Sequence, residues 1–158
     1  MYQELIIAMK IDVVQIELNK KYVIEIESEN SFVYGVETAA PIFINEIGKA
    51  NIEKAAVLCL DSTNKVINYS VIAMGDIKSV KVSIPQILKI ALLSNASKII
   101  IAHNHPSGVL EITTQDIDLT RKIAYLAKAF KIELIDSIIV NDKSAISIRE
   151  ESVMINEK

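Results

Sequence analysis

The two histidines of the chain, His103 and His105, lie two residues apart in the pentapeptide HNHPS, directly after an apolar run. Side chains alternate along a strand, so residues two apart point to the same side. We therefore expect the two imidazoles to converge at one end of a sheet. Eleven residues after His105, Asp116 falls in the first turn of a predicted helix, for which Thr113 is the expected N-cap.

Together, His103, His105 and Asp116 make a candidate set of three metal ligands. Catalytic zinc takes three protein ligands and keeps a further position for water, whose pKa the ion lowers to about 7. A general base must still collect and redeliver a proton. Glu53, just before the apolar run Ala55–Leu60, is the best-placed acid for that role. The pattern predicts one zinc ion per chain.

The elements that must position these residues alternate between helix and strand. Helices are predicted at Thr38–Gly48, with Pro41 in the first turn and Gly48 at the stop, after the Ser83–Gln86 capping box, and at Thr113–Phe130. Strands are predicted at Ala55–Leu60, Lys65–Ala73, Lys98–Ala102, Glu133–Val140 and Ala145–Ile148. The result is an α/β or α+β domain with a central mixed sheet.

Residues 1–34 are predicted to form a separate, strand-rich N-terminal extension, which leaves residues 35–158 as the main domain. Two alternating runs, Val13–Leu18 and Tyr22–Glu27, are the predicted strands of this extension. The polar stretch Asn19-Lys20-Lys21 between them suggests a hairpin.

Composition narrows the class of protein. The 158 residues are 51% hydrophobic, with a mean hydropathy of +0.32 and a net charge of −3, which excludes a disordered chain. No apolar run reaches the roughly 20 residues of a membrane span, and no signal peptide is recognised, so the cytoplasm is the expected location. Without a basic excess, nucleic acid is not favoured as a partner. The single cysteine, Cys59, allows no internal disulfide and is expected to be buried. Homo-oligomerisation stays open.

The stretch His103-x-His105-x7-Thr113-x-x-Asp116, with an upstream glutamate, resembles the JAMM (MPN-plus) metalloprotease motif. Beyond the motif, the chain resembles the RadC family, named for DNA repair, over roughly residues 36–150. The resemblance is carried by EKAAVLCLD, by SIPQILKIALLSNASKIIIAHNHPSG, by the TTQDIDLTRKIA helix and by LIDSIIVND.

The resemblance implies a cytidine deaminase-like JAB/MPN fold, with a curved, mostly antiparallel sheet flanked by about three helices. It implies that His103, His105 and Asp116 hold one zinc ion and that Glu53 is the general acid/base. Thr113 stands where the motif usually has serine, whose hydroxyl helps to hold the oxyanion, which makes Thr113 a candidate catalytic residue.

Other positions depart from the family pattern. Ser137 stands where RadC relatives usually carry histidine, and Gln86 stands where they carry arginine. The N-terminal helix-hairpin-helix segment of full-length relatives is missing from this sequence, which weakens the transfer of a DNA role.

Three functions follow from these patterns. The first is a zinc-dependent hydrolase, a metallopeptidase or isopeptidase that cleaves a peptide, isopeptide or related amide bond. The alternatives are a non-enzymatic module associated with DNA repair and a metal-dependent nuclease. Substrate contacts are expected from the loops Asp76–Val82 and Val109–Ile112. Simpler interpretations are a pair of ordinary hydrogen-bonded histidines, an acid at a helix N-terminus for Asp116 and a solvated side chain for Glu53.

Overall fold

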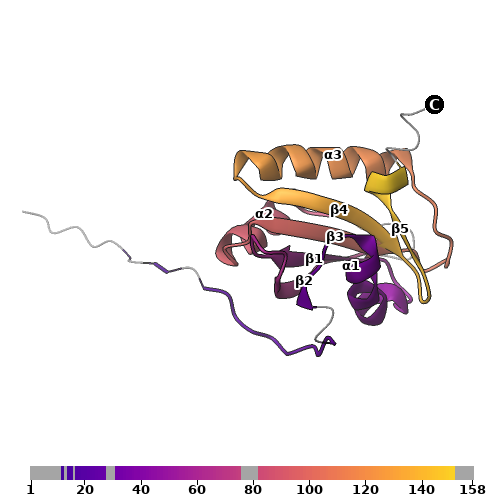
Figure 1. Ribbon diagram of the computed structural model, residues 1–158, viewed down its shortest axis with the longest axis horizontal. Coiled ribbons are helices and arrows are strands. Elements are labelled where there is room, and N and C mark those ends of the chain that lie inside the picture. Colours follow the sequence, from indigo (N-terminus) through magenta and orange to yellow (C-terminus); the bar gives the residue numbers. More distant parts are fainter. Residues whose placement is uncertain (1–11, 13, 16, 28–30, 76–81, 152–158) are drawn as a thin grey trace, which may run out of the picture.

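The computed structural model describes residues 12, 14–15, 17–27, 31–75 and 82–151. Figure 1 shows a twisted sheet with helices on both faces. The helices are α1 (Val36–Phe43), a π-helical continuation η2 (Ile44–Gly48), α2 (Ile84–Leu93) and α3 (Thr114–Ala129). The strands are β1 (Lys54–Leu60), β2 (Val66–Met74), β3 (Lys98–Asn104), β4 (Glu133–Val140) and β5 (Ala145–Ser147).

The five strands form one mixed sheet in the order β2-β1-β3-β4-β5. Three neighbouring pairs are antiparallel, and only β3 and β4 run parallel. A parallel pair needs a crossover connection, which α3 supplies. The predicted fold class is therefore confirmed, since the sheet is mixed, mostly antiparallel and flanked by helices.

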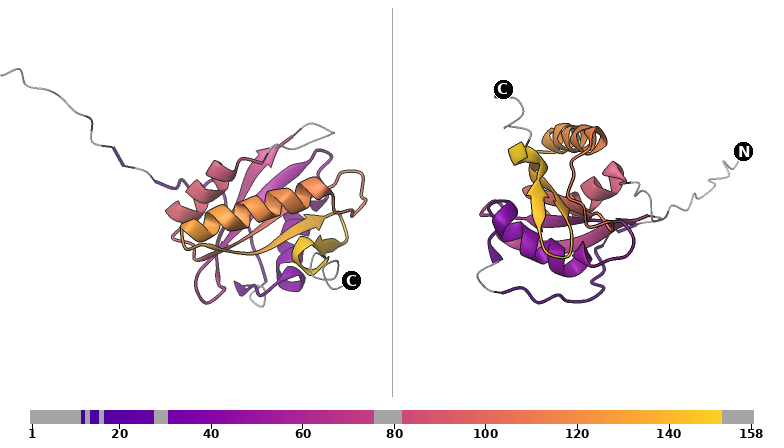
Figure 2. Two further views of the ribbon diagram at one scale, coloured as in Figure 1. Left: turned by 90° about the horizontal axis from the view of Figure 1, so that it is seen from above. Right: turned by 90° about the vertical axis from the view of Figure 1, so that its right-hand side faces the viewer.

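The two faces of the sheet carry separate halves of the core. Figure 2 shows α2 and α3 over one face and α1 over the other. On β1, Ala55, Val57 and Cys59 pack with α2 and α3, while Ala56, Leu58 and Leu60 pack with α1. This alternation, with both sides buried, explains why Ala55–Leu60 of β1 and Ile99–Ala102 of β3 are apolar. Cys59 is fully buried, as predicted.

The first helix differs from its prediction. It begins at Val36, so Pro41 lies inside it rather than in its first turn. The missing N–H of proline removes a helical hydrogen bond, and three residues later the chain widens into η2. The end at Gly48 is confirmed. A Cβ there would collide with the backbone carbonyl of Asn141, so this crossing requires glycine.

The hairpin predicted near the N-terminus is wrong, because its second strand does not form. Tyr22–Glu27 contains no strand. In the first predicted strand, Val13–Leu18, Val13 and Ile16 lie outside the described residues. Ile24 and Ile26 instead pack, half-buried, against the core on the α1 face. The alternation of apolar and polar residues in this segment therefore arises because one side of the chain packs on the domain. It has no partner strand among the described residues.

Candidate metal centre

Side chains alternate between the two faces of the sheet along β3, and this alternation continues to its last two residues. Ile99 and Ile101 face α2 and α3, and His103 continues that row, whereas Asn104 points to the α1 side. The strand is two residues longer than predicted and includes both His103 and Asn104. Because β3 lies in the middle of the sheet, β1 and β4 hold it on both sides.

The two imidazoles converge as predicted. Nε2 of His103 lies 3.2 Å from Nε2 of His105. Nδ1 of His105 lies 2.9 Å from the carbonyl oxygen of Val109. A carbonyl can only accept, so Nδ1 carries the proton and Nε2 of His105 keeps its lone pair toward His103. A hydrogen bond of this kind to the far nitrogen is the usual support of a metal-ligating histidine.

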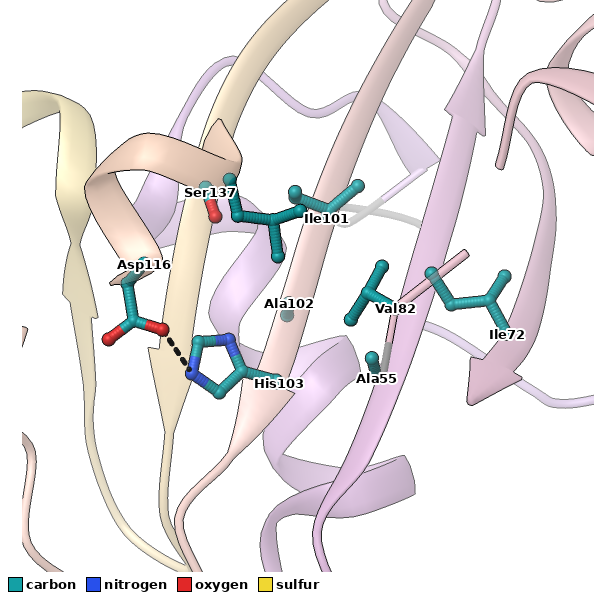
Figure 3. A pocket seen from close by; sticks show the side chains of 9 residues that line it. Ala55, Ile72, Val82, Ile101, Ala102, His103, Asp116 and Ser137 are labelled. Carbon is teal, nitrogen blue, oxygen red and sulfur yellow. Dashed lines mark ion pairs between the residues drawn. The ribbon is translucent and has the colours of Figure 1, made fainter. Parts of the chain in front are cut away.

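Asp116 approaches His103 from the start of α3. Its Oδ1 lies 3.3 Å from Nε2 of His103, a contact drawn as the dashed line in Figure 3. Its Oδ2 accepts from the backbone N–H of Thr113 at 2.8 Å and from the Thr113 hydroxyl at 2.7 Å. Thr113 is thus the N-cap of α3, as predicted, and its side chain also holds the carboxylate of Asp116 in place.

Glu53 belongs to the same cluster. One carboxylate oxygen of Glu53 and one ring nitrogen each of His103 and His105 all lie within 4.8 Å of one another. Glu53 is half-buried, directly before β1. Ala55, two residues later, pairs with His103 across the sheet, which places Glu53 beside the end of β3.

Asn104 is a site residue that the sequence analysis missed. Its Oδ1 accepts from the backbone N–H of Lys54 at 2.6 Å, and its Nδ2 donates to the carbonyls of Ala50 and Ile52 at 3.2 and 3.1 Å. The side chain is completely buried. It therefore fastens the segment that carries Glu53 to the strand that carries the histidines. An amide at a buried strand position between two candidate ligands was the available signal.

A small cavity of about 10 Å³ adjoins the cluster, which is room for about one water molecule. Figure 3 shows His103 and Asp116 on one side of it and the apolar side chains of Ala55, Ile72 and Val82 on the other. Burial lowers the pKa of His103 to about 4, although the nearby carboxylate of Asp116 acts in the opposite direction. His103 is therefore neutral at neutral pH, which is the form that binds a metal.

Two pairs of candidate donors have the spacing of ligands on a tetrahedral zinc ion. Two ligands bound at about 2.05 Å with a tetrahedral angle lie about 3.3 Å apart. The two separations measured at Nε2 of His103, 3.2 Å to His105 and 3.3 Å to Asp116, both match this spacing. His103 therefore stands at ligand spacing from both His105 and Asp116, and the donors that all lie within 4.8 Å of one another are those of Glu53, His103 and His105.

Asp61 and Asp136, which were predicted to fix turns and strand ends, make hydrogen bonds of that kind. Asp61 caps the β1–β2 turn by accepting from the backbone and hydroxyl of Thr63. Buried Asp136 accepts from the Ser147 hydroxyl at 2.6 Å.

Of the predicted substrate loops, Val109–Ile112 is described, whereas 76–81 lie outside the described residues. In the described part of the chain, no helix is long and apolar enough to cross a membrane.

Comparison with known proteins places the chain in a family. A family model described as a RadC-like JAB domain matches residues 33–153. A UPF0758 protein of Finegoldia magna is 34% identical over 114 residues, which are 72% of this chain and 51% of that protein. A UPF0758 protein of Psychrobacter is 34% identical over 136 residues, 85% of this chain and 60% of that protein. The chain thus spans about half the length of the curated relatives it matches. On the family match, which covers most of the fold as well as Glu53, His103, His105 and Asp116, this chain belongs to the RadC-like JAB domain family.

Proposed function

We propose that the protein is a zinc-dependent hydrolase of the JAMM type that cleaves a peptide, isopeptide or related amide bond. The observation that carries this proposal is the position of Nε2 of His103, which lies at tetrahedral ligand spacing from both His105 and Asp116. These three residues would hold one zinc ion. When bound, zinc supplies Lewis acidity for the substrate carbonyl and lowers the pKa of a water to about 7.

Glu53 is the proposed general acid/base. Its carboxylate lies within 4.8 Å of the two imidazole nitrogens, close enough to exchange a proton with a water bound beside them. Glu53 takes a proton from the attacking water and delivers it to the nitrogen of the leaving amine. The contacts of Asn104 keep the backbone before β1 at the distance this transfer needs.

For Thr113 we propose a positioning role in addition to the predicted catalytic one. Its hydroxyl proton is directed at Oδ2 of Asp116, and its oxygen accepts from the Asp116 N–H at 3.2 Å. The hydroxyl thereby fixes which carboxylate oxygen faces His103. Stabilisation of the oxyanion would require this hydroxyl to turn away from Asp116 during the reaction.

Elemental analysis tests the metal centre. We expect one zinc per chain in the wild type and none in His105→Ala, with both proteins folded by circular dichroism. A wild type purified without a stoichiometric metal, and unable to take up zinc on dialysis, would contradict the proposal. Zinc retained at one per chain by His105→Ala would place the ion elsewhere.

Hydrolysis is tested with a proteome-derived peptide library, read by mass spectrometry as new N-termini. Wild-type protein should generate them, and Glu53→Gln should lose at least about 100-fold in rate while it keeps its zinc. Glu133→Gln is the matched control, because Glu133 is exposed at the start of β4, at the other end of the sheet. Equal cleavage by Glu53→Gln would refute the role of this carboxylate, and no cleavage by the zinc-loaded wild type would refute a general peptidase.

A further inference from the structure

A second and larger cavity lies beside the metal centre. It has a volume of about 280 Å³, close to the lower end of small-molecule sites. One wall is a face of α3, and the other is β4 together with the residues that follow β5. We call it the arginine groove, and the polar residues lining it are Thr120, Arg121, Asp136, Ser137 and Arg149.

The groove brings together the only two arginines in the sequence. The chain has 17 basic residues, of which 15 are lysines, yet both Arg121 and Arg149 line this one cavity. Arg121 comes from α3 and Arg149 from the segment after β5, so two distant parts of the chain contribute one guanidinium each. A guanidinium offers a planar fork of donors that matches a carboxylate, which an ammonium does not.

One of these arginines is oriented by the backbone. Nη1 of Arg149 donates to the carbonyl of Ile135 at 2.9 Å. That bond uses one of the five N–H donors of the guanidinium and limits the rotation of the side chain. A side chain held in this way loses less entropy when it binds a ligand.

The charged side chains that line the groove favour a ligand with one negative charge. Asp136 lies in the lining, but its carboxylate already accepts from the Ser147 hydroxyl, from its neighbour's N–H and from the N–H of Arg149, at 2.6, 2.7 and 3.3 Å. Two guanidinium groups and one carboxylate leave one net positive charge. A carboxylate ligand balances it, whereas a phosphate, at about −1.5 to −2, exceeds it.

We propose that the arginine groove is a binding site for the carboxylate of a ligand, held between Arg121 and Arg149. Ser137 lines both this groove and the small cavity at His103 and Asp116, so the two sites share a wall. The lining positions of α3 begin one residue after Asp116 and end at Ala124, about 12 Å further along the helix axis at 1.5 Å per residue.

The position of the arginine groove beside the metal centre also indicates a substrate class. This inference rests on the proposed hydrolase function. A peptide whose scissile bond lies at the metal centre can place an acidic side chain, or a terminal carboxylate, a few residues away in the groove. The preferred substrates are therefore expected to carry a carboxylate on one side of the cleaved bond.

The binding site can be tested directly by NMR. With two arginines, the protein gives two arginine Nε–Hε signals, and Arg121→Gln identifies which is which. We expect N-acetyl-glutamate α-amide at millimolar concentrations to shift both signals. N-acetyl-glutamine α-amide, which has the same shape without the charge, should shift neither.

Variants complete the test. Arg121→Gln should weaken binding of the carboxylate probe by about tenfold or more, as expected for a charged hydrogen-bonded pair. Lys122→Gln makes the same charge change at the adjacent position of α3, outside the groove lining, and should alter binding less than twofold. Arg149→Lys keeps the charge without the fork, and should weaken binding if Arg149 acts through its geometry.

Several results would overturn the proposal. These are unmoved arginine signals, equal shifts with the amide probe, an equal loss in Lys122→Gln, or inorganic phosphate binding more tightly than the carboxylate. The titration needs neither metal nor turnover, so it is repeated on His105→Ala. Binding that persists there separates the groove from the metal centre, and failure of either proposal leaves the other measurable.

Discussion

Replacing Asn104 with alanine should loosen the metal centre at the segment that carries Glu53. The side chain makes three hydrogen bonds, to the N–H of Lys54 and to the carbonyls of Ala50 and Ile52. At about 1 kcal/mol net for each bond, the loss in the free energy of unfolding is about 3 kcal/mol. For a domain of this size, that corresponds to a fall in Tm of roughly 6–12 °C.

Two measurements check this. Urea unfolding gives the change in stability, and native-state hydrogen exchange gives its location. The Lys54 amide should exchange much faster in Asn104→Ala relative to the amide of Val57, which lies further along β1. Asn45→Ala, on an exposed helical residue whose amide donates to its neighbour Glu46, is the matched control and should change stability by less than about 0.5 kcal/mol.

A loss below 1 kcal/mol in Asn104→Ala, with unchanged protection at Lys54, would refute the reasoning. It would mean that the segment before β1 is held by other contacts and that Asn104 does not set the position of Glu53.

Three further predictions concern other parts of the fold. Gly48→Ala should destabilise the protein by about 2 kcal/mol or more in urea unfolding, because its Cβ meets backbone, whereas Gly35→Ala, with open space at its Cβ, should not. Burial raises the pKa of Cys59 from 9.0 to about 11, so its contribution to stability is present below pH 9 and is lost as the pH rises toward 11. The difference in unfolding free energy between wild type and Cys59→Ala should therefore shrink by up to about 3 kcal/mol over that range. Thr113→Ala should cost about 1 kcal/mol as a lost N-cap and lower zinc affinity about 10- to 100-fold in a chelator competition, while Thr113→Ser should restore both.

The regular elements of the domain were predictable because their signals are local. The bounds of β4 agree residue for residue with the prediction, and α3 agrees within its two capping residues. In both, the hydrophobic period and the end signals coincide. The convergence of His103 and His105 followed from the alternation of one strand, which needs no knowledge of the rest of the fold.

What could not be predicted depends on contacts between distant segments. The N-terminal run Tyr22–Glu27 alternates like a strand, but its apolar side packs on the core without pairing. The early start of α1 follows from packing of Val36 and its neighbours against the sheet. The role of Asn104 could not be predicted because its three hydrogen-bond partners are about 50 residues away in sequence.

The central place of β3 has a consequence for how the protein would handle the proposed ion. His103 lies on a strand with neighbours on both sides, and Asp116 lies at a helix start that is capped by Thr113. Zinc fingers unfold without their ion, since binding energy is their folding energy. Here a chelated sample should keep its secondary structure and accept a new ion rapidly, so that exchange among divalent cations follows their availability in solution.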